Sequence, residues 1–331
     1  MTRNVSISIE GNRVKAIVAV QRGLTTRVVE QLTFPLTELE SFLARERARD
    51  ITVSADFRSI YQETILLPPV KKSLERQLLQ SELKKKNPSI TGDLAIVFFR
   101  TGDKTVDGRQ QNEYYVYAVE TAELDELTEL FLRQGKRIRA LYPNMLAVLN
   151  ILPVKSEPFI CHYEAGNKKN LFLIKNGKVL FTRSAPSIGP GVVDYDVQNI
   201  NMTVNYCRQQ LRIEPTEVLL IGVGPKDLPT SRPTIPITFL TRPERLAVDD
   251  ALLAEYLIPL SALGGSSAAS IMTDEYRHFY LLSSLVHRGT AAFVLASILL
   301  AVLLVPNVIT LVELRQALTA MRKDPSQLSA L

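Results

Sequence analysis

The chain has 331 residues, enough for one large or two medium domains with proper hydrophobic cores. Two cysteines and three histidines exclude a disulfide framework and a histidine-based metal centre, and so few cysteines suit a reducing compartment. The net charge of +5 is a mild bias towards anionic surfaces, such as that of a membrane.

The N-terminal part predicts a β-hairpin followed by alternating helices and strands. Residues 5–9 and 14–20 are rich in Val, Ile and Ala and flank a Glu-Gly-Asn-Arg turn, which is a hairpin signal. We expect a helix at 36–48 and strands at 51–54 and 60–67.

Residues 71–86 predict a basic amphipathic helix. Leucines recur at helical spacing and form one apolar face: Leu74, Leu78, Leu79 and Leu83. Its basic residues are Lys71, Lys72, Arg76, Lys84, Lys85 and Lys86. A solvated face is the simplest interpretation of these charges, and a docking surface for an acidic protein is the next. Nucleic acid is disfavoured because no aromatic residues accompany the charges.

The following stretch predicts two strands and two helices. The strands are expected at 93–99 and 113–119, separated by a polar loop at 102–112, and the helices at 124–134 and 140–152.

A second block opens, like the first, with strands in hairpin order. Strands are expected at 159–163, 171–175 and 178–182, and Asn176-Gly177 between the last two is a strong signal for a two-residue turn.

The second block then returns to mixed elements. A helix at 196–211 precedes a buried strand at 217–221, which ends in the turn Gly222–Gly224. A strand at 235–240 and a helix at 248–263 follow. A turn at a strand end is the simplest role of the two glycines.

One apolar segment near the C-terminal end predicts a transmembrane helix. Residues 289–312 are 24 consecutive residues without a charge, and they include Pro306. At about 1.5 Å per residue they span roughly 36 Å, more than the hydrocarbon core of about 30 Å. The sequence MTRNVSISIE has no apolar run typical of a signal peptide, so we expect the preceding domain to remain cytoplasmic, although the charges flanking the span do not decide its orientation.

Five stretches along residues 4–265 carry a resemblance to a known family. They are VSISIEGNRVKAIVAV, LLPPVKKSLERQLLQSELKKKNP, YYVYAVETAELDELTELFLRQGKRIRALYPNMLAVLN, IKNGKVLFTRSAPSIGPG and VNYCRQQLRIEPTEVLLIGVG. In this order they resemble the PilM family, actin-like proteins of type IV pilus assembly, and its relative GspL of type II secretion. The segment DEYRHFYLLSSLVHRG, followed by the span, resembles the start of PilN, the membrane-bound partner of PilM.

The resemblance implies an α/β chain with the actin-like ATPase (ribonuclease H-like) fold in two halves plus an inserted subdomain, followed by one transmembrane helix. It places the cytoplasmic actin-like domain at residues 1–265 with the inserted subdomain at about 66–140. A linker and juxtamembrane segment would occupy 266–288, the membrane helix 289–312 and a short periplasmic stub 313–331.

The resemblance also locates a nucleotide cleft, but with altered chemistry. The matching cleft residues are Gly11, Asn12, Lys15, Gly222 and Gly224. Ser8 and His162 stand where the family has aspartates that help to hold Mg²⁺, and Glu10 and Glu164 stand where it has phosphate-loop glycines. Carboxylates facing phosphate repel it. Simpler roles are open too: Asn12 and Lys15 as turn and surface residues, and His162 as a semi-buried histidine.

The implied activity is therefore that of a degenerate ATPase, with no catalytic residues and no metal site. No cofactor is expected, although ATP binding is left open. The alternative is a working membrane-tethered ATPase or kinase, which would need a metal-holding acid such as Asp194; a helix N-terminus explains that aspartate equally well.

The implied role is that of a single-pass inner-membrane scaffold in a pilus-assembly or secretion platform. It would couple the cytoplasmic assembly or secretion ATPase to other inner-membrane platform proteins, act as a homo-oligomer and bind no nucleic acid. The expected partner contacts are the six basic residues of the helix at 71–86, together with Tyr276 and Arg277.

Overall fold

The structure is a computed structural model that describes residues 2–22, 25–240, 243, 246–265 and 269–323. The chain divides into two compact units, and the boundary between them falls between Thr273 and Asp274.

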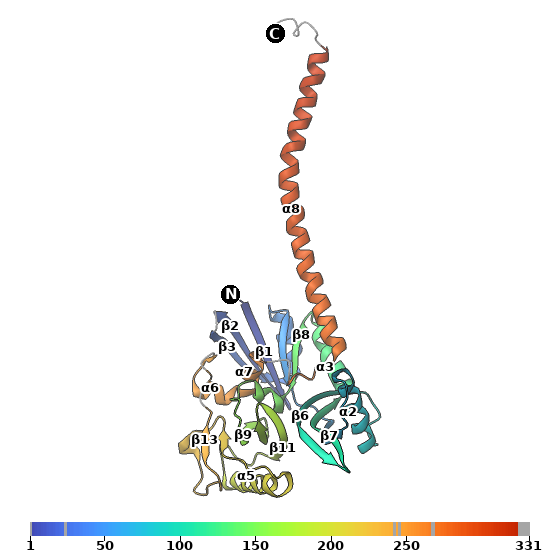
Figure 1. Ribbon diagram of the computed structural model, residues 1–331. Coiled ribbons are helices and arrows are strands. Elements are labelled where there is room, and N and C mark those ends of the chain that lie inside the picture. Colours follow the sequence, from blue (N-terminus) through green and yellow to red (C-terminus); the bar gives the residue numbers. More distant parts are fainter. Residues whose placement is uncertain (1, 23–24, 241–242, 244–245, 266–268, 324–331) are drawn as a thin grey trace. The chain divides into compact units, whose positions relative to one another are not determined.

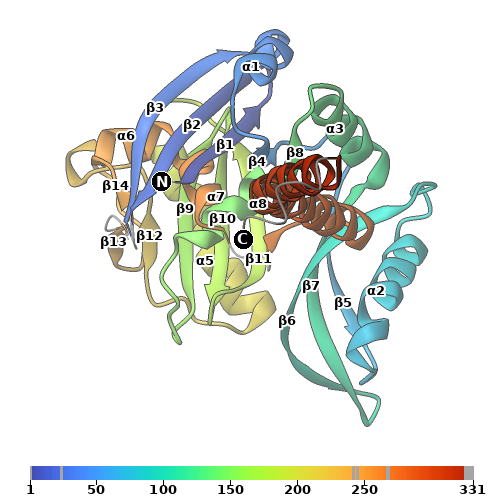
Figure 2. The same cartoon turned by 90° about the horizontal axis from the view of Figure 1, so that it is seen from above.

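The first sheet of the N-terminal unit has the strand order β14-β3-β2-β1-β4-β8 (Figures 1 and 2). Its strands are β1 (Thr2–Glu10), β2 (Arg13–Arg22), β3 (Thr25–Pro35), β4 (Asp50–Ala55), β8 (Arg137–Pro143) and β14 (Leu246–Ala247). The central strand β1 pairs antiparallel with β2 and parallel with β4. Both of its faces are buried, since Ile7 on one face and Ser8 on the other are inaccessible to solvent.

The second sheet repeats this arrangement, in the order β11-β10-β9-β12-β13. Its strands are β9 (Phe159–Ala165), β10 (Lys168–Lys175), β11 (Lys178–Pro186), β12 (Val218–Leu220) and β13 (Ile237–Phe239). Strand β9 pairs antiparallel with β10 and parallel with β12, as β1 does with β2 and β4. The predicted Asn176-Gly177 turn is confirmed, with positive φ at both residues.

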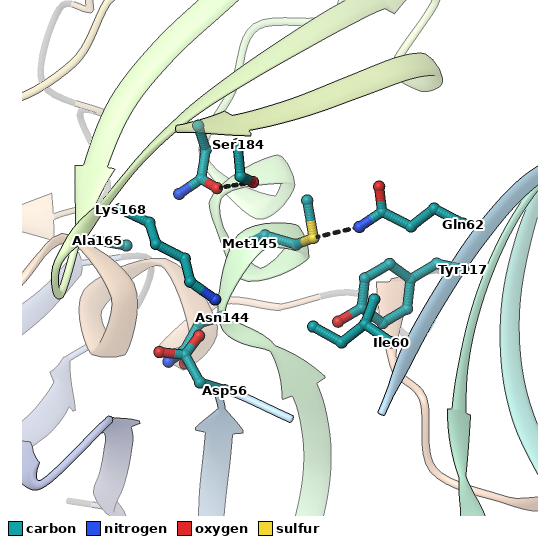
Figure 3. Close-up of a pocket in the computed structure, with 10 residues that line it drawn as sticks. Asp56, Ile60, Gln62, Tyr117, Asn144, Met145, Ala165, Lys168 and Ser184 are labelled. Atoms are coloured by element: carbon teal, nitrogen blue, oxygen red, sulfur yellow. Dashed lines mark hydrogen bonds between the residues drawn. The ribbon is translucent and has the colours of Figure 1, made fainter. Parts of the chain in front are cut away.

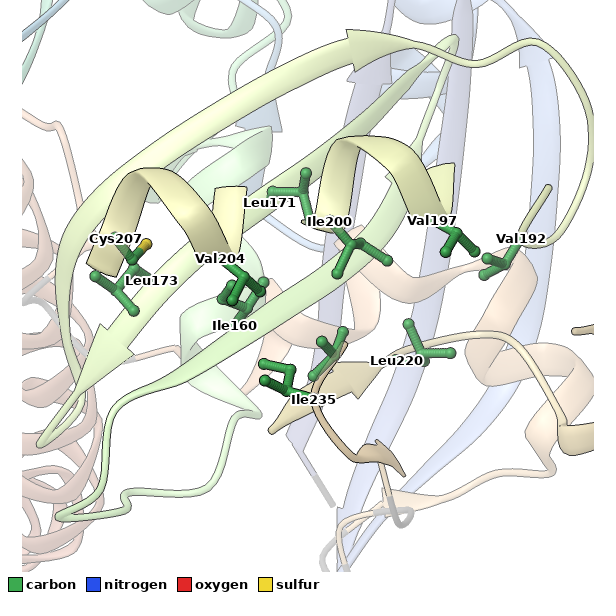
Figure 4. Close-up of a cluster of buried hydrophobic side chains, with 11 residues drawn as sticks. Ile160, Leu171, Leu173, Val192, Val197, Ile200, Val204, Cys207, Leu220 and Ile235 are labelled. Atoms are coloured by element: carbon green, nitrogen blue, oxygen red, sulfur yellow. The ribbon is translucent and has the colours of Figure 1, made fainter. Parts of the chain in front are cut away.

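Helix α5 (Asp194–Tyr206) covers one face of this second sheet (Figure 4). Ile200 and Val204 of α5 lie in one buried cluster with Ile160 of β9 and Leu171 of β10. The helix continues as one π turn, Cys207–Leu211. The face of α5 and the face of the sheet that meet in this cluster are both apolar, so the two layers exclude water between them.

The third sheet, β5-β7-β6, forms the inserted subdomain. Its elements are β5 (Ile60–Leu67), α2 (Lys72–Lys86), β6 (Leu94–Val106) and β7 (Arg109–Glu120). The subdomain therefore begins with β5 and not at residue 66. Leu79 and Leu83 of α2 are buried against it, whereas Leu74 is 46% exposed and does not belong to the apolar face predicted for it.

The polar loop predicted at 102–112 is wrong. Strands β6 and β7 run on as a paired hairpin to a two-residue turn at Asp107-Gly108, where both residues have positive φ. These strand ends are polar because they project into solvent, and cross-strand pairing holds them without an apolar face.

Three further predictions need correction. The helix expected at 140–152 begins only after Pro143, because residues 140–143 complete the parallel strand β8; it is the short α4 (Asn144–Ala147) with a 3-10 turn at Val148–Asn150. The helix expected at 248–263 is two helices, α6 (Asp250–Glu255) and α7 (Leu257–Leu263). Strand β3 has no predicted counterpart; exposed and partly buried residues alternate along most of it, and none of its residues is fully buried.

The remaining helices and 3-10 turns connect the strands. They are a 3-10 turn at Leu36–Glu38, α1 (Leu39–Arg45), α3 (Thr121–Arg133) and a 3-10 turn at Pro225–Asp227. Helix α7 packs on β1, β2 and β4, and α3 packs on β8.

Part of the linker predicted at 266–288 belongs to the N-terminal unit. Ala269 and Ile271 are buried, and Leu141 of β8 accepts hydrogen bonds from Ile271 N (2.9 Å) and Ser270 Oγ (3.1 Å). Residues 266–268 of this linker lie outside the described residues.

The second unit is one long helix, α8 (Asp274–Lys323), which continues through Pro306. Ala292–Thr319, a segment of 28 residues, is long and apolar enough to cross a membrane: its most apolar 18-residue window has a mean hydropathy of 2.6, and none of that window is buried in the structure. The apolar helix thus runs beyond the predicted end at residue 312. Of the predicted stub at 313–331, residues 313–323 continue the helix and 324–331 lie outside the described residues.

Candidate functional site

The turns of the two equivalent hairpins, β1–β2 and β9–β10, meet at the junction of the two halves. Gly11 and Gly166 in these turns both have φ of +60°. A Cβ atom added to Gly166 would lie 3.6 Å from Cβ of Glu10 and 3.9 Å from Oδ2 of Asp56, so the second turn lies close to the end of the first hairpin. A Cβ atom added to Gly11 would have no other atom within 4 Å, so only the backbone conformation favours glycine at this position.

Glu10 fills the first turn with a buried carboxylate that is already paired. It is 8% exposed, and its two carboxylate oxygens have different partners. Ser8 Oγ donates to Oε1 at 2.7 Å, and Lys15 Nζ lies 3.3 Å from Oε2. Ser8, Glu10 and Lys15, which the resemblance places at the nucleotide cleft, therefore satisfy the hydrogen-bonding and charge requirements of one another.

Lys15 also joins the first hairpin to α6. Its ammonium donates to the carbonyl oxygen of Glu255, the last residue of α6, at 2.8 Å. Asn12 is exposed, and its carbonyl oxygen accepts from Leu36 N at 2.9 Å. Both residues predicted to bind nucleotide thus have structural contacts here.

Behind the turns, Asp56 and Asn144 are tied to the end of β1. Ile9 O accepts from Asp56 N at 3.1 Å and from Asn144 Nδ2 at 2.7 Å. Burial raises the pKa of Asp56 and the charge of Glu10 adds to this rise, while a hydrogen bond from Asn144 and the charge of Lys168 act against it. None of Asp56, Asn144 and Lys168 stands out in the sequence.

Asp56 and Asn144 line a pocket of about 380 Å³ between the first sheet, the subdomain and the second hairpin (Figure 3). In Figure 3, Lys168 reaches towards Asp56 and Asn144, and Gln62 and Tyr117 lie across the pocket. Gln62 Nε2 donates to Met145 Sδ at 3.3 Å. The lining therefore combines one carboxylate and one ammonium with amides.

His162 occupies the second hairpin where the resemblance expects an aspartate. It is 2% exposed, and neither ring nitrogen has a hydrogen-bond partner. Burial lowers its pKa to about 4, with a smaller opposing effect of Asp196. The ring is neutral at pH 7, so it does not replace the charge of an acid.

A buried ion pair lies next to His162. Lys169 Nζ is 2.6 Å from Asp196 Oδ2, with 2% and 1% of the two side chains exposed. Lys169 also donates to Gly191 O at 2.8 Å, and Asp196 accepts from Val193 N, which caps α5. Asp194 is the first residue of α5, in agreement with the simpler interpretation of this aspartate as one at a helix N-terminus.

The predicted turn Gly222–Gly224 borders a pocket of about 710 Å³ formed with α6 and β13. Gly222 has φ of +73°, and a Cβ atom there would lie 3.4 Å from Ala254 Cα, so this turn requires glycine. The volume is in the range of small-molecule sites. Among the described residues, no three His, Cys, Asp or Glu side chains gather as a metal site.

Most of the predicted basic surface on α2 is bound within the subdomain. Arg76 donates to Ile96 O at 2.9 Å. Each of the three C-terminal lysines lies near a carboxylate: Lys84 near Asp93 (3.3 Å), Lys85 near Glu82 (2.5 Å) and Lys86 near Glu63 (3.4 Å). Lys71 and Lys72, at the start of the helix, are exposed.

The other two predicted partner residues, Tyr276 and Arg277, lie in the first turn of α8, in the second unit. Arg277 lies 3.8 Å from Asp274. They belong to a different unit from the basic residues of α2.

The chain matches no protein-family model and no curated protein sequence. Its fold is shared with a chain of the PilM–PilN type IV pilus biogenesis complex, at 14% identity and a TM-score of 0.60, over 80% of this chain and 96% of that one. It is also shared with the cytoplasmic domain of EpsL, an inner-membrane component of the type II secretion system of Vibrio cholerae, at 11% identity and a TM-score of 0.52. That match covers 83% of this chain and all of the EpsL domain. The predicted actin-like α/β fold and its likeness to PilM and GspL-type proteins are confirmed.

We expect acid to destabilise the fold through His162. Its pKa of about 4 lies below the ordinary value of 6.5, so between these pH values the unfolded chain binds a proton that the folded chain does not. The free energy of unfolding should fall by up to about 3 kcal/mol as the pH drops through this window. Urea unfolding followed by circular dichroism measures it. His162→Phe should remove this part of the pH dependence; an unchanged profile would contradict the prediction.

We expect Lys169→Met to destabilise the N-terminal unit by about 3–5 kcal/mol, because it leaves the carboxylate of Asp196 buried without its ammonium. The double variant Lys169→Met/Asp196→Leu should cost less than the single one. Arg208→Met is the matched control, since its partner Glu214 is 65% exposed, and it should cost at most about 1 kcal/mol. Urea unfolding checks all three; equal losses for Lys169→Met and Arg208→Met would refute the assignment.

Proposed function

We propose that this chain is a single-pass inner-membrane scaffold of a type IV pilus assembly or type II secretion platform. Its N-terminal unit lies in the cytoplasm as a pseudo-ATPase, and α8 anchors it in the membrane. The scaffold couples the cytoplasmic assembly or secretion ATPase to the other platform proteins of the inner membrane.

The observation that carries this proposal is the fold of the N-terminal unit together with the apolar helix that follows it in the chain. The N-terminal unit has the fold of proteins from a pilus biogenesis complex and a secretion system, over nearly the whole length of both. A helix able to cross a membrane follows directly after it. The EpsL domain is described as the cytoplasmic part of an inner-membrane component, which is the same layout.

The contacts in the cleft support a pseudo-ATPase. Hydrolysis in such a cleft requires backbone amides facing phosphate and a metal ion that compensates its charge. Here Glu10 brings a carboxylate to the first turn, and Lys15 is held by Glu10 and by Glu255 O. In the second hairpin the neutral ring of His162 stands where an acid would help to hold the metal.

The alternative is an active, membrane-tethered actin-like ATPase or kinase. One observation favours it: the pocket beside Gly222 has a volume of about 710 Å³ and lies where the resemblance expects adenosine. That pocket and the one beside Asp56 have no lining residue in common.

We expect no Mg²⁺-dependent ATP turnover by the full chain in detergent micelles, and ATP binding no tighter than about 1 mM, because the phosphates would face Glu10. Calorimetry and phosphate release, with and without Mg²⁺, check this. Turnover that disappears in Gly224→Asp but persists in Gly102→Asp, a change at a glycine with open space around it, would make the protein an enzyme.

We expect the exposed start of α2 to contribute to docking of the assembly or secretion ATPase. Lys71→Glu/Lys72→Glu should weaken that binding about tenfold by reversing two charges, while the fold is retained because both side chains are exposed. The matched control is Lys175→Glu/Lys178→Glu, which reverses two exposed lysines beside the Asn176-Gly177 turn. Binding measured by biolayer interferometry that is the same for both variants would remove α2 from the interface.

A further inference from the structure

The span of α8 contains a carboxamide, that of Asn307, five residues before the end of the charge-free segment 289–312. Asn307 lies within the apolar segment Ala292–Thr319 and its side chain is exposed in the isolated chain. Its Nδ2 donates to Leu303 O of the preceding turn at 2.9 Å. One N–H and the carbonyl oxygen of the amide remain to be satisfied, and lipid chains offer neither donors nor acceptors.

Leucines flank Asn307 on the same face of the helix. Leu300 and Leu314 lie seven residues before and after it, and Leu304 and Leu311 lie three before and four after it. We call these five residues the Asn307 face. The spacing of four and three residues is that of a helix–helix seam, and each of the four leucines is at least half exposed.

We infer that α8 pairs with α8 of a second copy of this chain through the Asn307 face, with the two Asn307 amides bonded to each other. A carboxamide is both donor and acceptor, so two copies related by a two-fold axis satisfy one another. Such side-chain hydrogen bonds join helices in membranes, where a lone amide is costly. The leucines on both sides pack the helices together. The inference rests on the anchor role proposed above for α8.

The opposite face of α8 supplies a matched control. At about 100° per residue, Ile298 lies nine residues and about 180° away from Asn307. Ile298 and Leu300 are at nearly the same depth in the span, so cysteines at the two positions differ mainly in the face they occupy. The native Cys161 and Cys207 are buried and should not contribute to cross-linking.

The test is oxidative cross-linking of the full chain in isolated inner membranes. Leu300→Cys should form a covalent homodimer with at least about three times the yield of Ile298→Cys. Adding Asn307→Leu should lower the Leu300→Cys yield by about three- to tenfold, and Asn307→Gln, which keeps the carboxamide, should retain it. Equal yields from both faces, no effect of Asn307→Leu, or cross-linking to a different protein would overturn the inference.

Extraction with alkaline carbonate separates this inference from the proposed function. A chain that stays in the membrane but forms no dimer overturns only the pairing of α8. A chain released by carbonate overturns the anchor role, and the pairing with it. Asn307→Leu should remain in the membrane as the original chain does, because the substitution makes the span more apolar.

Discussion

The interaction on which the cleft depends is the contact of one ammonium with two partners. Lys15 lies between the buried carboxylate of Glu10 and the carbonyl oxygen of Glu255. It thereby joins the first hairpin to the end of α6, which is adjacent to α7 and hence to the first sheet. A buried charge is stable only when it is paired, so Glu10 and Lys15 hold each other in place.

The second half also contains a buried pair of opposite charges, formed by different residues. Lys169 and Asp196 form a pair more buried than that of Glu10 and Lys15, and Asp196 also caps α5. His162, in the adjacent strand, remains neutral because the protein offers it no polar partner. The first hairpin thus has an internal cation–carboxylate contact where the resemblance expects phosphate, and the second has a neutral histidine where it expects a metal-holding aspartate. The two sheets retain their shared topology, although the residues at the cleft positions differ from those that the resemblance leads one to expect.

Several elements could be predicted because their signals are local. The Asn176-Gly177 turn follows from a dipeptide that accepts positive φ, and the span in α8 follows from apolar length alone. The hairpin end at Asp107-Gly108 carries the same kind of turn signal, but its polar strands were interpreted as a loop. Strand β3 was missed because its partly buried face carries only three large apolar residues, Val28, Leu32 and Phe34, and the exposed Glu30 interrupts their alternation.

The sequence by itself determined the long apolar helix, the two hairpins and the resemblance to PilM, because each depends on neighbouring residues or on motifs in order. Only the tertiary structure decided which charges meet in the cleft. Lys15 and Glu255 are 240 residues apart, and Asn144 and Ile9 are 135 apart. Periodicity and propensity describe one element at a time, whereas an ion pair depends on which distant elements fold together and on how much water they exclude.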